Sequence, residues 1–131
     1  MTSKPEHPKK ILVVDDMRTI QVLLPVYLVG RFYEFQSVSS AKEALEVIED
    51  FGPDLIISDV NMPDMGGSQL CEAIRQHERF GQTPVVLMSG SVNRSELDAI
   101  GAVSKASAVV SKPIDPEKLA TIVHDLLEDD D

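Results

Sequence analysis

The sequence predicts an α/β fold, with one domain in which a five-stranded parallel sheet lies between two layers of helices. Short apolar segments of strand length alternate along the chain with longer segments whose apolar residues recur at helical spacing. The strand-like segments are largely apolar at consecutive positions, which is typical of strands buried on both faces of a parallel sheet. The length of 131 residues and the hydrophobic content of 43% suit a single domain with a well-filled core.

The first strand and the first helix are expected at residues 11–14 and 17–28. Residues 11–14 are all β-branched or leucine and end at the acidic pair Asp15-Asp16. Residues 17–28 carry apolar side chains at the three- and four-residue spacing of a helix. Pro25 lies inside this helix and should kink it or mark its end, because proline has no N–H and crowds the preceding turn.

The second strand is expected at residues 34–38, with a weaker apolar pattern than the first. Either Ser39 or Ser40 can cap the helix that follows, because a serine hydroxyl accepts a hydrogen bond from an N–H of the first turn. This helix should end at Gly52-Pro53, which is a strong stop signal.

The third strand is expected at residues 54–59, which are apolar on both faces up to the terminal Asp59. A loop over residues 60–67 follows and ends in a pair of glycines. The third helix is expected at residues 68–78, where the apolar residues again have helical spacing.

The remaining strands are expected at residues 83–89 and 108–111, with a more polar helix at residues 95–102 between them. A last helix should begin at Asp115 or Pro116 and extend to about residue 127, because proline suits the first turn of a helix. Five strands therefore alternate with five helices, and the crossovers should be right-handed.

The charge and the composition restrict the class of protein. The formal net charge is −10, and such a surface repels nucleic acid phosphates, so this chain is not expected to bind nucleic acid directly. No apolar segment approaches the roughly 20 residues that cross a bilayer. The single cysteine, Cys71, falls in a helical pattern and is expected to be a small buried residue. We expect a cytoplasmic protein with no membrane association.

Three segments are expected along the chain. Residues 1–9 form a polar, flexible leader, residues 10–128 form the domain, and residues 129–131 form a short acidic tail. The polar leader lacks the apolar stretch of a signal peptide.

Polar side chains follow four of the five expected strands at the point where each strand ends. They are Asp15, Asp16, Asp59, Ser89 and Lys112. In open parallel sheets the functional crevice lies at the carboxyl ends of the strands, so we expect these side chains to lie close together. A single aspartate at a strand end often only caps the following turn, but five such residues in register with the fold indicate a site.

Phosphoryl transfer is the chemistry that these residue types favour. Clustered carboxylates repel one another, and a Mg²⁺ ion, which prefers oxygen ligands, relieves that repulsion. A carboxylate can attack phosphorus, the ammonium group of Lys112 can neutralise a phosphoryl oxygen, and the hydroxyl of Ser89 can donate a hydrogen bond to another.

The sequence resembles the response-regulator receiver domains of two-component signalling over nearly its whole length. Four segments carry the resemblance, in the order and at the spacing of that family: Ile11 to Asp16, Asp59 to Gly67, Ser89-Gly90 and Lys112-Pro113. The resemblance implies a flavodoxin-like (βα)5 doubly wound fold with strand order 2-1-3-4-5.

The resemblance also implies a role for each site residue. Asp59 matches the phosphoacceptor, and Asp15 and Asp16 match the acidic pair that holds Mg²⁺ together with Asp59. Asn61 matches a residue that supplies a metal ligand through its backbone carbonyl. Ser89 and Lys112 match the switch hydroxyl and the phosphate-contacting lysine.

Other matches concern the backbone. The family commonly has a cis bond at the place of Lys112-Pro113, and Pro63, Gly66 and Gly67 match the loop that leads into the third helix. At two positions the sequence departs from the common family pattern.

Gly90 stands where the family often has alanine. Because glycine is smaller than alanine, we expect Gly90 to leave the phosphorylation site open. Val109 stands where the family often has a tyrosine or phenylalanine that moves with the switch hydroxyl. Because valine has no ring to swing, we expect the signal to leave mainly through the loop after Ser89 and the helix from about Ser95.

The expected function is a phosphorylation-activated switch. A sensor histidine kinase or a small phosphodonor would supply the phosphoryl group, and a downstream protein or an attached output domain would read the result. Such a chain catalyses only its own phosphorylation and dephosphorylation and is not an enzyme on other substrates.

Three other classes of protein fit the sequence less well. An aspartate-nucleophile phosphatase needs a second acid two residues after the nucleophile, where this chain has Asn61. A flavin carrier needs a phosphate-binding loop after the first strand, where this chain has Asp16-Met17-Arg18, and the P-loop signature is also absent from the sequence. A receiver-like scaffold that binds partners without phosphorylation would be favoured by loss of an acidic ligand or of Lys112, and neither is lost.

Overall fold

The five strands form one fully parallel sheet in the order β2-β1-β3-β4-β5, in a computed structural model that describes residues 7–30, 32–91 and 93–128. The order 2-1-3-4-5 that the family resemblance implies is confirmed. The elements in chain order are β1 (Lys10–Val14), α1 (Arg18–Tyr27), β2 (Glu34–Val38), α2 (Ala41–Phe51), β3 (Leu55–Asp59), α3 (Gly67–Arg75), β4 (Val85–Ser89), α4 (Arg94–Ser104), β5 (Ala108–Ser111) and α5 (Pro116–Leu127).

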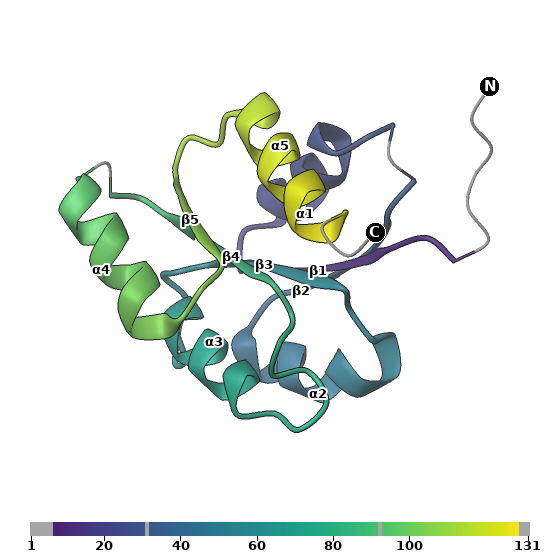
Figure 1. Cartoon of the computed structure of the whole chain (residues 1–131), viewed down its shortest axis with the longest axis horizontal. Helices are drawn as coiled ribbons and strands as arrows, with labels where there is room; N and C mark the ends of the chain where they lie inside the picture. Colours follow the sequence, from purple (N-terminus) through teal and green to yellow (C-terminus); the bar gives the residue numbers. More distant parts are fainter. Residues whose placement is uncertain (1–6, 31, 92, 129–131) are drawn as a thin grey trace.

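Helices cover both faces of the sheet, with α1 and α5 on one face and α2 and α3 on the other (Figure 1). Consecutive residues of a strand point to opposite faces, so the sheet divides the apolar core into two halves. Val13 and Ile57 pack with α1 and α5, whereas Val14 and Ile56 pack with α2 and α3. The fourth helix, α4, lies at the β5 edge of the sheet (Figure 1).

The expected caps and stop signals lie at the ends of α2. Ser40 rather than Ser39 is the N-cap, and its hydroxyl accepts a hydrogen bond from the Glu43 N–H at 3.1 Å. Gly52 ends the helix in the left-handed conformation, with φ of +64°, which glycine adopts at no steric cost. In α1, Pro25 lies two residues before the end of the helix at Tyr27.

The third helix ends at Arg75, three residues before the predicted end at residue 78. The Arg75 guanidinium donates hydrogen bonds to the carbonyl oxygens of Gly81 and Thr83, at 3.2 and 2.7 Å. In the same turn, His77 Nδ1 accepts hydrogen bonds from the N–H groups of Arg79 and Phe80. These contacts stabilise a turn in place of the last helical turn that the apolar spacing predicted.

The region after α3 differs from the prediction in small ways. The strand β4 begins at Val85 and not at residue 83, because Pro84 has no N–H to donate to a neighbouring strand. The helix α4 is longer than predicted and runs from its cap at Asn93 to a left-handed residue, Lys105.

Cys71 is fully buried in the core between the sheet and α2 and α3, as predicted. Burial raises the pKa of its thiol above the ordinary value, so little thiolate is present at neutral pH. No helix within the described ranges has the length and apolar character that crossing a membrane requires.

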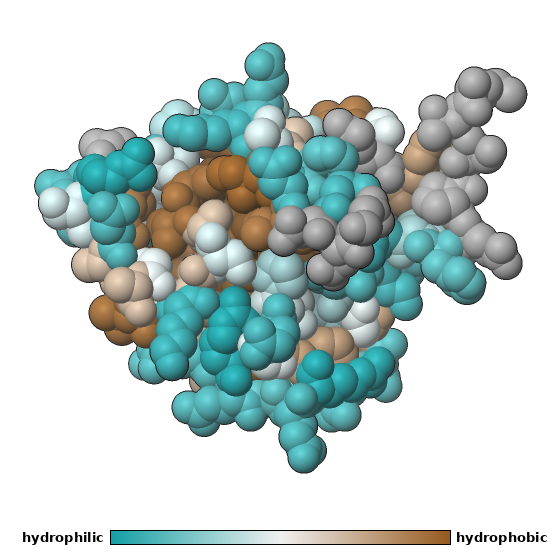
Figure 2. Space-filling view, viewed as in Figure 1, coloured by the Kyte–Doolittle hydropathy of each residue, from teal (hydrophilic) through white to brown (hydrophobic). Residues whose placement is uncertain are grey.

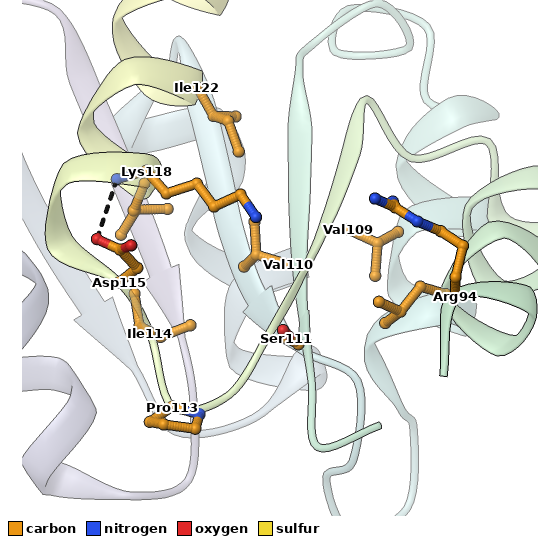
Figure 3. Close-up of a pocket in the computed structure, with 11 residues that line it drawn as sticks. Arg94, Val109, Val110, Ser111, Pro113, Ile114, Asp115, Lys118 and Ile122 are labelled. Atoms are coloured by element: carbon orange, nitrogen blue, oxygen red, sulfur yellow. Dashed lines mark hydrogen bonds between the residues drawn. The ribbon is translucent and has the colours of Figure 1, made fainter. Parts of the chain in front are cut away.

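A hollow of about 390 Å³, lined by both apolar and charged side chains, lies between α4, β5 and α5. Brown, hydrophobic atoms mark this region on the face shown in Figure 2. Figure 3 shows Val109, Val110 and Ile122 facing the hollow, with Arg94 at its α4 side and Lys118 at its α5 side. Val109 lines this hollow with a short side chain, at the position where the family often has an aromatic ring.

Candidate functional site

The carboxyl ends of β1, β3, β4 and β5 meet at one edge of the sheet, as the parallel pairing requires. Asp15 directly follows β1, Asp59 is the last residue of β3, Ser89 is the last residue of β4, and Lys112 directly follows β5. Asp15, Asp59 and Ser89 are buried, with exposed fractions of 0%, 5% and 3%. The polar residues expected at the strand ends therefore share one edge, and most of them are shielded from solvent.

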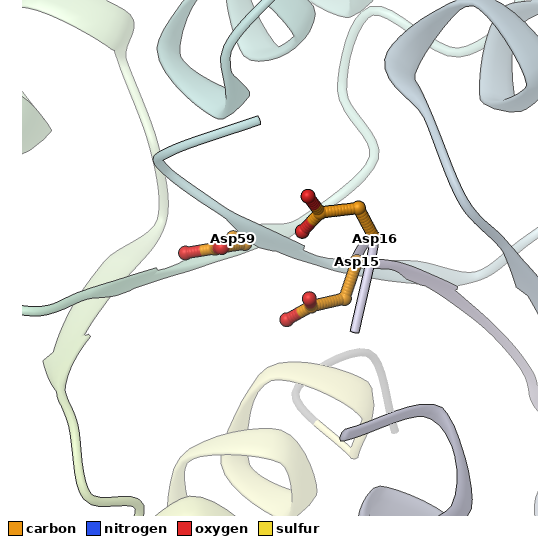
Figure 4. Close-up of side chains that lie close together, drawn as sticks. All are labelled: Asp15, Asp16 and Asp59. Carbon is orange, nitrogen blue, oxygen red and sulfur yellow. The ribbon is translucent and has the colours of Figure 1, made fainter. Parts of the chain in front are cut away.

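Three carboxylate groups lie together at this edge. One oxygen from each of Asp15, Asp16 and Asp59 lies within 4.8 Å of the others. Figure 4 shows these side chains gathered around a common space, with Asp16 from the loop after β1 approaching Asp59 on β3. Asp16 is exposed, so the cluster opens to solvent on that side.

Asp15 shows the electrostatic cost of this arrangement. Burial of its carboxyl group raises its pKa above the ordinary value, and the charges of Asp59 and Asp16 act in the same direction. A hydrogen bond from the Met17 N–H to Asp15 Oδ1, at 2.8 Å, and the charge of Lys112 oppose the rise of the pKa. The ionised form of Asp15 is therefore destabilised by its surroundings.

Lys112 is the cation of the site. Its Nζ lies 3.1 Å from Asp59 Oδ1 and 3.9 Å from Asp15 Oδ2. The backbone holds it there, because the Lys112 N–H donates to the Ser89 carbonyl oxygen at 2.8 Å. The Lys112-Pro113 bond is cis, as the family resemblance implies. One ammonium group thus lies near two of the three clustered carboxylates.

The loop after β3 is held tightly against Asp59. The Asn61 N–H points to Asp59 Oδ1 at 3.4 Å, and the Gly67 N–H donates to the Val60 carbonyl oxygen at 2.9 Å. A Cβ atom on Gly67 would overlap the Asp59 carbonyl oxygen and lie 3.1 Å from Ser58 Oγ. Only glycine fits at this position without moving the backbone of Asp59.

The hydroxyl of Ser89 takes part in a different contact. Ser89 Oγ accepts a hydrogen bond from the Ser91 N–H at 3.1 Å. Among the described residues, no hydrogen bond joins it to Asp59 or to Lys112. The structure thus brings together Asp15, Asp16, Asp59 and Lys112, with Ser89 at the next strand end facing the loop that follows it.

Gln21 on α1 also belongs to the site, although the sequence reasoning missed it. Its side-chain amide donates to the Asp15 carbonyl oxygen at 2.8 Å and to Ser39 Oγ at 3.2 Å. It therefore ties the loop that carries the acidic pair to the loop after β2. The signal in the sequence is a polar residue on the same helical face as the buried Leu24 and Leu28.

The donor set fits a hard divalent cation. The carboxylates supply only oxygen atoms, which Mg²⁺ prefers, and a binding site of two or three carboxylates suffices because the ion keeps several waters. The buried Asp15 Oδ2 accepts no hydrogen bond from any described residue. A cation bound at this edge would give this oxygen a direct ligand contact, in addition to the distant charge of Lys112, and would offset the repulsion in the cluster.

We expect Asp15→Asn to stabilise the metal-free protein at pH 7, by on the order of 1 kcal/mol in the free energy of unfolding. Because folding raises the pKa of Asp15, its ionisation costs stability; the cost is absent below the ordinary aspartate pKa and grows as pH rises through the folded value. The gain from Asn should therefore shrink as the pH is lowered toward about 4.

Urea unfolding in EDTA at several pH values measures this gain. Asp98→Asn, which removes an exposed carboxylate from α4, is the control and should change stability by less than about 0.5 kcal/mol. An Asp15→Asn variant that is less stable than the wild type in EDTA would contradict the proposed repulsion.

Comparisons with known proteins agree on one family. The sequence pattern of the response regulator receiver domain matches residues 11–124. The transcriptional regulatory protein GltR of Pseudomonas aeruginosa is 31% identical over 91% of this chain and 49% of its own length. The regulatory protein VanR of Enterococcus faecium is 34% identical over 84% of this chain and 46% of its own length. The chain spans about half the length of these curated relatives.

Solved structures have the same fold over nearly the whole chain. A putative response regulator from Chloroflexus aurantiacus has a TM-score of 0.86 and 31% identity, covering 93% of this chain and 99% of that one. The chemotaxis protein CheY4 of Vibrio cholerae has a TM-score of 0.83 and 29% identity, covering 92% of this chain and 100% of that one. The likeness therefore covers nearly the whole architecture of the chain.

Proposed function

The chain belongs to the response regulator receiver domain family of two-component signalling, and from that membership we propose that it is a switch controlled by phosphorylation of Asp59. Response regulators are signalling proteins and not classical enzymes. The observation that carries the proposal is the ion pair between Lys112 Nζ and Asp59 Oδ1 at 3.1 Å, beside two further carboxylates.

In the proposed reaction, a carboxylate oxygen of Asp59 attacks the phosphorus of the donor. A bond forms between that oxygen and phosphorus as the bond between phosphorus and the donor breaks, and the product is an aspartyl phosphate. The donor is a phosphohistidine of a sensor histidine kinase or a small phosphodonor. Hydrolysis of the aspartyl phosphate by the same site resets the switch.

The chain's own residues have separate roles in this reaction. Lys112 lies close enough to Asp59 to neutralise charge on a phosphoryl oxygen, and its backbone N–H bond to Ser89 fixes its place. The hydroxyl of Ser89 can donate to a second phosphoryl oxygen after it turns from Ser91. Asp15, Asp16, Asp59 and the backbone carbonyl of Asn61 would hold Mg²⁺, which would supply positive charge to offset that of the carboxylates and the phosphoryl oxygens.

The output of the switch is a change in binding to a partner protein or to an attached output domain. Some curated relatives of about twice the length are named transcriptional regulatory proteins, and others are named DNA-binding response regulators. We do not expect this chain to contact nucleic acid itself, because its net charge is −10. The proposed compartment is the cytoplasm, in keeping with the unpaired thiol of Cys71.

Labelling with acetyl phosphate tests the proposal. With Mg²⁺ present, the intact mass should increase by one phosphoryl group, and hydroxylamine should remove the adduct because acyl phosphates are labile to it. Chelation of Mg²⁺ by EDTA should suppress labelling. Reduction with borohydride before digestion should mark Asp59 in the peptide that contains it.

Two outcomes would count against this function. A stable adduct on a serine or histidine would mean that the chemistry is not carboxylate phosphorylation. No adduct on folded protein in Mg²⁺, with either acetyl phosphate or phosphoramidate, would favour a receiver-like scaffold that acts without phosphorylation.

A further inference from the structure

Three hydrogen bonds centred on Ser91 join the hydroxyl of Ser89 to the first turn of α4. The Ser91 N–H donates to Ser89 Oγ at 3.1 Å, and the Ser91 hydroxyl donates to Glu96 Oε2 at 2.8 Å. The Asn93 N–H donates to Ser91 Oγ at 3.1 Å. Ser91 therefore stands between the end of β4 and the start of α4, and its N–H and its hydroxyl face opposite ends of this connection.

Within the part of the chain that the structure describes, few other hydrogen bonds hold the N-terminal end of α4. Asn93 caps the helix through a hydrogen bond from the Glu96 N–H to its side-chain oxygen, at 3.2 Å. Residues 94–96 are exposed, and Leu97 is the first buried residue of the helix. Because little apolar surface is buried here, the hydrogen bonds of Ser91 and Asn93 largely determine the position of this end.

The C-terminal end of α4 is fixed to its neighbours. Arg75 Nε donates to the Lys105 carbonyl oxygen at 3.0 Å, which ties the end of α4 to α3. A Cβ atom on Gly101 would lie only 3.3 Å from Val109 Cγ2, so α4 and β5 pack closely at this point. A movement of α4 should therefore be a rotation about its C-terminal end, with the largest displacement at Asn93.

The strand β5 offers no large side chain that could carry the signal instead. Val109 and Val110 are the apolar β5 residues that line the hollow between α4 and α5, and Val109 stands at the position of the family's aromatic residue (Figure 3). Its β-branched side chain is short and stiff about its first torsion. Among the described residues, the hydrogen bonds of Ser91 thus connect the Ser89 hydroxyl directly to the first turn of α4.

We propose that Ser91 transmits the phosphorylation state of Asp59 to α4, an inference that rests on the proposed function. A phosphoryl group on Asp59 presents charged oxygen atoms, and a hydrogen bond to a charged acceptor is stronger than one between neutral groups. The Ser89 hydroxyl turns toward the phosphoryl group, and the Ser91 N–H loses its acceptor. The loop then rearranges, Ser91 leaves Glu96, and the first turn of α4 is released.

Amide hydrogen exchange with beryllofluoride and Mg²⁺, which imitate the phosphorylated state, tests this proposal. In the wild type, beryllofluoride should speed exchange over residues 93–98 by about three- to tenfold, the factor that the loss of one or two hydrogen bonds gives. In Ser91→Ala, exchange over these residues should already be fast without beryllofluoride and should change little on its addition. Ser91→Thr, which keeps the hydroxyl, should behave as the wild type.

Affinity provides a readout that simple loosening of the helix would not change. If beryllofluoride must break the hydrogen bonds of Ser91 in order to bind, removal of the hydroxyl relieves that cost, because coupling between two sites is reciprocal. Ser91→Ala should then bind beryllofluoride about three- to tenfold more tightly than the wild type. Glu96→Ala should do the same, whereas Ser95→Ala, an exposed position in the same turn, should have wild-type affinity.

The outcomes separate this proposal from the proposed function. A wild type that shows no Mg²⁺-dependent binding of beryllofluoride would overturn the proposed function. A wild type that binds beryllofluoride, with residues 93–98 unresponsive or with Ser91→Ala unchanged in both exchange and affinity, would overturn the role of Ser91 alone.

Discussion

Replacing Asp59 with Asn should abolish phosphorylation of the protein by small phosphodonors. The amide of Asn keeps the shape of the side chain but carries no negative charge, so its oxygen is a poor nucleophile toward phosphorus. Loss of a residue that forms the covalent bond in a reaction lowers the rate by a factor of about a thousand or more. The variant should remain folded, because loss of the ion pair with Lys112 is partly offset by relief of repulsion from Asp15 and Asp16.

Asp64→Asn is the matched control for this experiment. Asp64 lies in the loop that follows Asp59, is exposed, and has a φ of +69°, which Asn adopts readily. Its labelling by acetyl phosphate, followed by intact mass with time, should equal that of the wild type. If Asp59→Asn were labelled as fast as Asp64→Asn, the acceptor would have to be another residue.

Gly67→Ala should be among the most destabilising substitutions of a small residue in this chain. Its Cβ atom would overlap the Asp59 carbonyl oxygen and crowd Ser58 Oγ, and forcing extra atoms into packed structure costs about 1–3 kcal/mol. Alanine favours a helix over glycine by about 1 kcal/mol, but Gly67 is at the first helical position, where that gain is small. We expect a net loss of about 2 kcal/mol in the free energy of unfolding.

Gly90→Ala tests whether the effect of Gly67→Ala comes from the overlap and not from alanine itself. A Cβ atom on Gly90 would meet no atom within 4 Å, so this variant should differ from the wild type by less than about 0.5 kcal/mol. Urea unfolding measures both variants, and acetyl phosphate labelling should be slowed only in Gly67→Ala, where the backbone of Asp59 has to move. Equal stability of the two variants would contradict the prediction, because it would show that the loop moves to accommodate the extra methyl group without loss of stability.

The positions of the site residues could be predicted because they follow from simple features of the sequence. Four of the five strand-like runs end at a polar site residue, and parallel strands bring their carboxyl ends to one edge of the sheet. Asp15, Asp59, Ser89 and Lys112 therefore lie at one edge. Their proximity within that edge depends on the strand order, which alternation of strands and helices does not determine and which came from the family resemblance.

Contacts between distant segments could not be predicted in this way. The end of α3 depends on Arg75 reaching Gly81 and Thr83, and these hydrogen bonds override the apolar spacing that continued the helix. Gln21 contacts the carbonyl oxygens of Asp15 and Val38 at the ends of two neighbouring strands, and Ser91 depends on the path of the chain between β4 and α4. Such contacts involve side chains whose types are common in loops and helices and carry no pattern of their own.

The division of the apolar core by the sheet has a consequence for how such chains diverge during evolution. A substitution on α5 changes the packing against Val13 and Ile57, whereas a substitution on α2 changes the packing against Val14 and Ile56. Effects of substitutions that are far apart and share no partners are close to additive. One helical layer can therefore accumulate changes that suit a new partner without compensating changes in the other, while the strand-end residues stay constant.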